Sequence, residues 1–202
     1  MIYLSPQTSR LASLPERWGQ LHTPQSWGCY VRPGIKWAAD NGQFSGRVTV
    51  AQFFAWLEAM RPYRHSCLFA TAPDVVGNAV ATLDKYRFYA WRIKALGYPV
   101  ALVGQDGLES LPWPPEYDAF FVGGSTEWKM SDAADWCIAK AKASGAWVHV
   151  GRVNSQRRIR HFQLVGVDSC DGTALAFAPN ERMRELNTAI QQPPLFEMEI
   201  NL

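Results

Sequence analysis

Short apolar segments recur along the chain, and most of them end in Gly, Asp, Asn or Pro. Eight of these segments are candidate strands: IYLS (2–5), GCYVR (28–32), KWAAD (36–40), SCLFATA (66–72), PVALVG (99–104), AFFVG (119–123), WVHVG (147–151) and FQLVGVD (162–168). Their apolar character is nearly continuous, not alternating. It therefore indicates strands that are buried on both faces, as in a parallel sheet.

Helical patterns fill several of the gaps between these segments. Residues 48–61 carry apolar side chains at helical spacing. Capping residues predict further helices: from Asn78 to Gly97, from Ser131 to Gly145, a short one over 156–161 after Ser155, and one that begins at Asn180 and stops before Pro193. Residues 6–27, which hold Pro15 and Pro24, predict a short helix at most.

Eight strands that alternate with helices predict an α/β fold: a compact (β/α)8 TIM-like barrel that forms a single domain over residues 1–202. A doubly wound open sheet is the main alternative. Ligands bind at the carboxyl ends of parallel strands in both architectures. The residues that directly follow each strand are therefore the candidates for function.

Composition limits the classes of partner and site. The net charge of the 202-residue chain is only +2, so nucleic-acid binding would depend on a local basic patch. The four cysteines form no CxxC pair, so neither a zinc site nor a disulfide framework is predicted, and a reduced cytoplasmic compartment is expected. No signal-peptide pattern opens the chain, and no apolar run reaches the roughly 18 residues that a membrane span needs.

Acids, amides and glycines follow the predicted strands. They include Asp40-Asn41-Gly42-Gln43-Phe44, Asp74, Gln105-Asp106, Gly123-Gly124 and Gly151-Arg152. Turn-forming residues are common at strand ends, so each taken alone has a purely structural interpretation. Taken together, they indicate a binding rim. Asp74 and Gln105 offer an acceptor and an amide that suit a purine edge, and the glycine pair would let backbone N–H groups approach a planar ligand.

The segment VGVDSCDGT (165–173) carries two acids, Asp168 and Asp171, at the end of an apolar run. Aspartate is depleted in strands and favoured in turns. One interpretation is a turn after a strand. The other is a catalytic carboxylate at the carboxyl end of a strand.

The strand-end motifs, taken in order, resemble those of the tRNA-guanine transglycosylases. The motifs are ADNGQF (39–44), TAPDVVG (71–77), LVGQDG (102–107), FVGGS (121–125) and GVDSCDG (166–172). The likeness is greatest to the compact branch implicated in 7-deazaguanine modification of phage and bacterial DNA. It implies a (β/α)8 barrel that exchanges guanine for a 7-deazaguanine.

The resemblance also implies roles for individual residues. Asp171 matches the nucleophile and Asp168 the acid upstream of it, while Asp40 matches an acid/base group near the base. Asp74 and Gln105 match the pair that recognises the purine edge. Gly123 and Gly124 match a backbone element that contacts the base.

Two departures from the family pattern bear on the substrate. The motif that reads Asp-Ser-Gly-Gly-Phe in the family reads Asp-Asn-Gly-Gln-Phe here. The zinc-binding extension that helps the tRNA enzymes grip tRNA and dimerise has no counterpart in this sequence. DNA is therefore the expected partner ahead of tRNA, together with a free base such as 7-cyano-7-deazaguanine. A homodimer or a helper protein is left open.

The expected chemistry is a double displacement at the anomeric carbon, with Asp171 as nucleophile, Asp40 as proton shuttle and no metal or cofactor. The target nucleotide must leave its stack. Arg152, Arg157 and Arg158, together with Lys129, are the candidate nucleic-acid contacts, although a solvated helix face is an equal interpretation of the arginines.

Other interpretations stay open. Trp128 is expected in the core, and His65 and His149 are interpreted as structural. A base-releasing nucleosidase, a non-enzymatic binding module and an unrelated sugar-phosphate barrel are the alternatives to base exchange.

Overall fold

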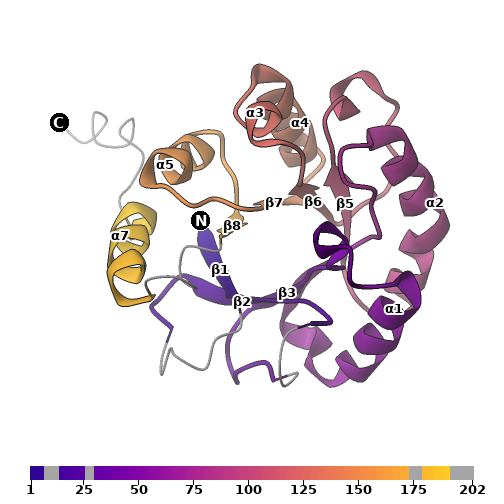
Figure 1. Ribbon diagram of the computed structural model, residues 1–202, viewed down its shortest axis with the longest axis horizontal. Coiled ribbons are helices and arrows are strands. Elements are labelled where there is room, and N and C mark those ends of the chain that lie inside the picture. Colours follow the sequence, from indigo (N-terminus) through magenta and orange to yellow (C-terminus); the bar gives the residue numbers. More distant parts are fainter. Residues whose placement is uncertain (7–13, 26–29, 173–178, 192–202) are drawn as a thin grey trace.

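The computed structural model describes residues 1–6, 14–25, 30–172 and 179–191, and eight parallel strands close into a barrel in sequence order (Figure 1). The strands are β1 (Ile2–Pro6), β2 (Trp18–His22), β3 (Trp37–Ala39), β4 (Cys67–Thr71), β5 (Val100–Gly104), β6 (Ala119–Val122), β7 (Trp147–Val150) and β8 (Ser169–Asp171). Pairing of β1 with both β2 and β8 closes the sheet. The predicted (β/α)8 barrel is confirmed.

Helices surround the barrel (Figure 1). They are α1 (Val50–Ala59), α2 (Ala79–Ala95), α3 (Thr126–Lys129), α4 (Asp132–Ala143), α5 (Gln156–Leu164) and α7 (Pro179–Gln191), with 3₁₀ turns at η1 (Gln43–Ser45), η2 (Arg61–Ser66) and η3 (Leu108–Ser110). The predicted cap at Asn78 is confirmed, because its side chain accepts from the Ala81 N–H at 3.0 Å. Gly97 and Gly145 follow α2 and α4 with φ of 86° and 80°, the left-handed conformation that ends helices.

The prediction of the second strand was wrong. Residues 28 and 29 lie outside the described residues, and residues 30–32 form no strand. Strand β2 lies instead at Trp18–His22, within the stretch expected to hold a short helix. Its polar Gln20 and His22 are buried, and they interrupt the apolar run by which the other strands are recognised. Gln20 still holds the later segment in place, because its Oε1 accepts from the Arg32 N–H at 3.1 Å.

The predicted eighth strand, residues 162–168, was also wrong. Residues 162–164 belong to α5, which runs longer than expected because Phe162 is buried against the core. Gly166, with φ of 81°, ends that segment, and β8 begins only at Ser169. The shift moves Asp168 out of the strand end and leaves Asp171 as its last residue. The other six predicted strands lie within one or two residues of their observed positions.

Strand alternation separates two apolar layers. Leu4, Ala38, Phe69, Ala101 and Ala119 pack inside the barrel. A larger cluster lies between the strands and the helices. Side chains two positions apart point to the same side of a strand. The side chains two residues after this inner layer therefore also point inward and lie at the carboxyl-end mouth of the barrel. Asp40 is one of them.

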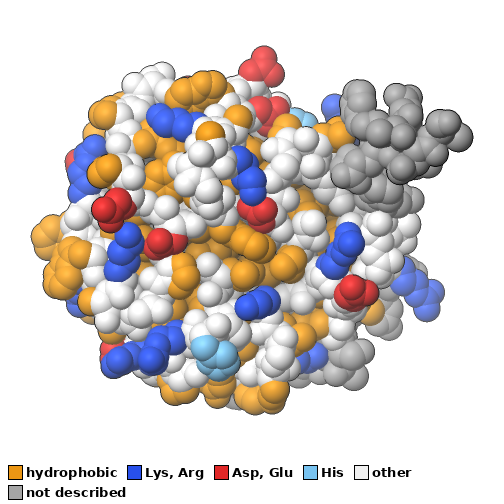
Figure 2. Space-filling model, turned by 180° about the vertical axis from the view of Figure 1, so that it is seen from behind, with side chains coloured by type: hydrophobic (Ala, Val, Ile, Leu, Met, Phe, Trp, Pro, Cys, Tyr) orange, Lys and Arg blue, Asp and Glu red, His pale blue; other side chains and the backbone are white. Residues whose placement is uncertain are grey.

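Two findings concern the surface. None of the described helices is long and apolar enough to cross a membrane. Figure 2 shows one face of the molecule, on which positive and negative side chains are interspersed.

Candidate functional site

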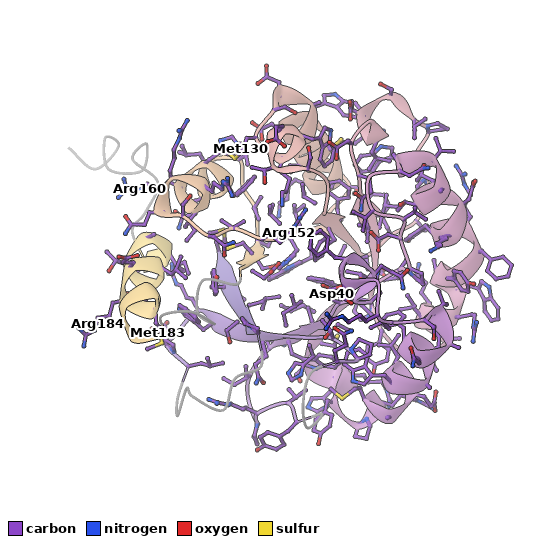
Figure 3. All side chains as sticks on the ribbon, viewed as in Figure 1. Asp40, Met130, Arg152, Arg160, Met183 and Arg184 are labelled. Atoms are coloured by element: carbon purple, nitrogen blue, oxygen red, sulfur yellow. The ribbon has the colours of Figure 1, made fainter. Side chains whose placement is uncertain are left out.

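A cavity of about 220 Å³ opens among the carboxyl ends of the strands. Six of the predicted site residues line it together: Asp40, Asp74, Gln105, Gly123, Arg152 and Asp171. Figure 3 shows Asp40 and Arg152 over the interior of the barrel, whereas Arg160 and Arg184 lie at its periphery. A second, larger groove of about 610 Å³ lies on the outside between α1 and α2, away from these groups.

Asp40 directly follows β3 and is half-buried. Burial raises its pKa to about 7, the hydrogen bond from the Gly42 N–H at 3.0 Å opposes the rise, and the negative charges of Asp171 and Asp74 add to it. A carboxyl group with this pKa can both give and take a proton near neutral pH. That property suits the predicted role of a proton shuttle.

Asp74 and Gln105 form a buried pair. The Gln105 Nε2 donates to Asp74 Oδ2 at 2.8 Å, and the Gln105 Oε1 accepts from the Gly77 N–H at 3.0 Å. These two bonds fix which end of the amide faces the carboxylate. Burial raises the pKa of Asp74, and the hydrogen bond from Asn41 is the largest effect that lowers it.

Asn41 was not predicted to be a site residue. Its Nδ2 donates to Asp74 Oδ1 at 3.0 Å and to the Ala72 carbonyl at 2.7 Å, while its Oδ1 accepts from the Gln43 N–H at 2.8 Å. Asn41 occupies one of the two positions at which the sequence departs from the family motif. The departure places a second amide donor on the carboxylate of Asp74, and the motif comparison could have singled it out.

Asp171 ends β8 with 13% of its side chain exposed. Its Oδ1 accepts from the Arg152 backbone N–H at 3.3 Å and lies 3.0 Å from the His149 Nε2. The interpretation of His149 as merely structural missed this contact. The ring is fully buried inside the barrel and points at the candidate nucleophile.

The glycine pair has a different role from the one predicted. The N–H groups of Gly123 and Gly124 both donate to the Gly104 carbonyl, at 2.9 and 3.1 Å, so they are not directed at a ligand. Their carbonyls accept from Arg152 Nη2 at 2.7 and 2.8 Å. Gly123 lines the cavity, whereas a Cβ on Gly124 would lie 2.5 Å from the Asp106 carboxylate.

Arg152 therefore lines the cavity. Its guanidinium stacks over the Phe44 ring, 4.4 Å from the centroid, and its backbone adopts φ of 62°. With Val103 and Phe121 also lining the cavity, the site combines polar groups with apolar faces. Inward strand positions such as Val103 look like ordinary core in the sequence, and for that reason they were not predicted.

Asp168, which was also expected among the substrate-binding residues, does not line the cavity. Its carboxylate pairs with Lys142 Nζ at 2.8 Å and accepts from the Val148 N–H at 2.7 Å. Asp168 precedes β8 and also bonds to the first residue of β1, because its carbonyl accepts from the Ile2 N–H at 2.7 Å. It therefore fastens the amino ends of the strands, at the opposite mouth from Asp171.

The predicted nucleic-acid contacts differ in accessibility. Lys129 is 4% exposed and donates to the Gly151 carbonyl at 2.7 Å, so its ammonium group is not presented at the surface. Burial lowers its pKa to about 8, with the nearby Arg152 adding to the effect. Arg157 is exposed in the first turn of α5, and Arg158 is half-buried.

Trp128 is buried, as expected, and its Nε1 donates to Glu109 at 2.9 Å. No group of three or more His, Cys, Asp or Glu among the described residues is placed to hold a metal ion.

Comparisons with known proteins give only distant likenesses. No protein-family model matches the chain, and no curated protein matches it either. One similar solved structure is 3-hexulose-6-phosphate synthase from Salmonella typhimurium, with 17% identity, a TM-score of 0.47, and coverage of 78% of this chain and 74% of that one. Another is tryptophan synthase from M. tuberculosis in its aminoacrylate- and BRD0059-bound form, with 16% identity, a TM-score of 0.46, and coverage of 78% and 59%. Likenesses at this level bear on neither the reaction nor the substrate of this chain.

Proposed function

We propose that the protein is a base-exchange transglycosylase that replaces guanine in DNA with a 7-deazaguanine derivative through a covalent aspartyl–glycosyl intermediate. The observation that carries the proposal is the convergence of two carboxylates and a base-reading pair on one cavity. Asp171 and Asp40 supply the carboxylates, and Asp74 and Gln105 supply the pair. The order of these motifs in the sequence, which resembles that of the transglycosylases, supports the same reaction.

The hydrogen bonds within the cavity favour a guanine-like edge. A carboxylate has about four lone-pair sites, so Asp74 can still accept two hydrogen bonds after those from Asn41 and Gln105. The Gln105 amide also keeps one N–H. Two acceptors beside one donor complement the N1–H, 2-amino and 6-oxo groups of guanine, and 7-deazaguanines retain that edge. Adenine presents an acceptor at N1 and a donor at its 6-amino group, so it would leave buried polar groups unpaired.

The chemistry follows from the two remaining acids. The Asp171 carboxylate attacks the anomeric carbon as the bond to guanine breaks, and protonated Asp40 gives its proton to a nitrogen of the leaving base. The incoming deazapurine then loses its N9 proton to Asp40 and attacks the same carbon, which breaks the ester to Asp171. Two inversions restore the original configuration. A pKa of about 7 at Asp40 suits both proton transfers.

The nucleic acid would approach over the same mouth. The sugar–base bond is shielded inside a duplex, so the target nucleotide must be flipped out or single-stranded. Arg157 is the accessible cation of the predicted set, at the amino end of α5, where anions are favoured. A cavity of about 220 Å³ has room for one small planar group, which is consistent with capture of a single base.

The test is mass spectrometry of nucleosides from DNA and from tRNA, each incubated with the protein and candidate deazapurines. Labelled guanine that enters DNA without abasic sites would support base exchange. Abasic sites without incorporation would instead indicate a nucleosidase, and incorporation into tRNA alone would replace the DNA assignment. An Asp171→Asn variant should show neither incorporation of the label nor abasic sites. Asp84→Asn, on the exposed face of α2, should behave as wild type.

A further inference from the structure

A hydrogen-bonded column runs through the interior of the barrel and ends at Asp171. The Trp147 Nε1 donates to the Ser169 Oγ at 2.8 Å, and that oxygen lies 2.9 Å from the His149 Nδ1. The His149 Nε2 lies 3.0 Å from the Asp171 Oδ1. Two of these residues come from β7 and two from β8, each pair two positions apart. All four therefore point inward.

The donors along the column have one consistent direction. The indole N–H of Trp147 can only donate, so the Ser169 oxygen accepts from it. Among the described residues, the one acceptor within hydrogen-bonding distance of the Ser169 hydroxyl is then the His149 Nδ1. A neutral imidazole that accepts at Nδ1 carries its proton at Nε2. That proton faces the Asp171 carboxylate.

The two carboxylate oxygens of Asp171 differ in their hydrogen-bond partners. Oδ1 accepts from the His149 ring and from the Arg152 backbone N–H. Oδ2 has no hydrogen-bond partner within the part of the chain that the structure describes, and Asp171 lines the cavity. Oδ2 is thus the oxygen of Asp171 that no hydrogen bond from the described residues engages, and it is left free to react.

We propose that His149 is the positioning residue of the candidate nucleophile. Its Nε2–H holds Asp171 Oδ1, so that Oδ2 attacks the anomeric carbon, and Ser169 and Trp147 fix the ring in the tautomer that can do this. The inference rests on the proposed function for the reaction, but the column itself does not. Packing limits rotation of the ring, because the Phe69 and Phe121 centroids lie 5.2 and 4.8 Å from it.

The column has a role in both half-reactions. In the first, Oδ2 forms the ester bond and Oδ1 becomes its carbonyl oxygen. In the second, the incoming base displaces that ester, and the electron pair returns to the carboxylate. The donors on Oδ1 stabilise the negative charge that develops as the ester breaks.

The first experiment does not depend on activity. In protein labelled with ¹⁵N in the histidine rings, the signals of His149 are identified by their loss in His149→Gln. The expected state is a protonated Nε2 and an unprotonated Nδ1. Asp171→Asn should shift the Nε2–H signal, and Ser169→Ala should allow the other tautomer. A proton on Nδ1 in the wild type, or a signal that Asp171→Asn leaves in place, would overturn the column.

The second experiment measures exchange of labelled guanine into DNA. Because a 1 Å misplacement of a reacting group slows a reaction about 10²-fold, His149→Leu should lower kcat roughly ten- to a hundredfold. KM for the base should stay within about twofold, because Asp74 and Gln105 still bind the base. His149→Gln places an amide N–H near the Nε2 position and should recover most of kcat. His161→Gln, which alters a histidine paired with Asp135 outside the cavity, is the matched control.

The two experiments distinguish a failure of the positioning role from a failure of the proposed function. A wild-type kcat in folded His149→Leu would refute the positioning role even if the tautomer is as expected. If His149→Leu does not fold, the kcat values of Ser169→Ala and His149→Gln test the positioning role instead, because Ser169→Ala leaves the side chains of the cavity in place. The expected tautomer in a wild type that exchanges no base would refute the proposed function and leave the contact between His149 and Asp171 standing.

Discussion

Substitution of Asp40 by Asn should stabilise the protein, and more so at alkaline than at acidic pH. Burial raises the pKa of this carboxyl group from 3.8 to about 7. Between these values the folded state therefore holds a proton that the unfolded chain has released. Stability falls with rising pH wherever the folded state binds more protons. The presence of Asp40 thus destabilises the fold progressively from about pH 4 to about pH 7.

The magnitude follows from the size of the rise. One pKa unit corresponds to about 1.4 kcal/mol, so the full rise amounts to about 4 kcal/mol at pH 8 and to less than about 2 kcal/mol at pH 5. Asn stays neutral and keeps an oxygen that can accept from the Gly42 N–H. For a domain of this size, 1 kcal/mol shifts Tm by about 2–4 °C, so Asp40→Asn should melt roughly 8–16 °C above the wild type at pH 8.

The assay is thermal unfolding, followed by circular dichroism, of both proteins at pH 5 and pH 8. Asp84→Asn, which removes an exposed carboxylate on α2, is the control and should change Tm little at either pH. A Tm difference between wild type and Asp40→Asn that is equal at the two pH values would refute the raised pKa. A variant less stable than the wild type at pH 8 would refute it as well.

Three further predictions concern function and packing. Asp171→Ala should abolish exchange while binding of the free base stays measurable by calorimetry, because the base-reading pair is untouched; full activity would remove Asp171 from the reaction. Asp74→Ala should weaken binding of the base far more than binding of DNA, and equal losses would contradict a base-reading role. Gly124→Ala should lower the free energy of unfolding by about 1–3 kcal/mol in urea titrations, because the added Cβ would lie 2.5 Å from the Asp106 carboxylate and 2.6 Å from the Trp128 ring.

The strands that the sequence predicted well share one property. Segments such as 99–104 and 119–123 are apolar throughout, because both of their faces are buried. Strand β2 breaks that rule with the polar side chains of Gln20 and His22, which are both buried. The bond from the Arg32 N–H to Gln20 satisfies a buried polar group through tertiary contact. The periodicity of apolar residues in the sequence does not reveal such a contact.

The residues of the candidate site were likewise predicted well in some segments and misplaced in others. Asp40, Asp74 and Gln105 could be predicted because each lies at or just after the end of a strand that was placed within one residue, whereas Asp171 was singled out by its match to the family motif. Asp168 was misplaced because the eighth strand was placed several residues too early. The two mouths of a barrel are one short strand apart, so an error of that size exchanges the site for its opposite end.

Buried polar side chains inside the barrel also explain why His149 was missed. A histidine in the middle of a strand usually has a structural role, and sequence alone does not reveal what faces it across the interior. In a closed barrel, neighbouring strands bring Ser169 and Asp171 to the two nitrogens of one ring. Because neither contact is local, each residue looks unremarkable in its own segment. The chemistry of this site is therefore set by strand register, since a shift of one residue in β8 would turn both Ser169 and Asp171 away from the ring.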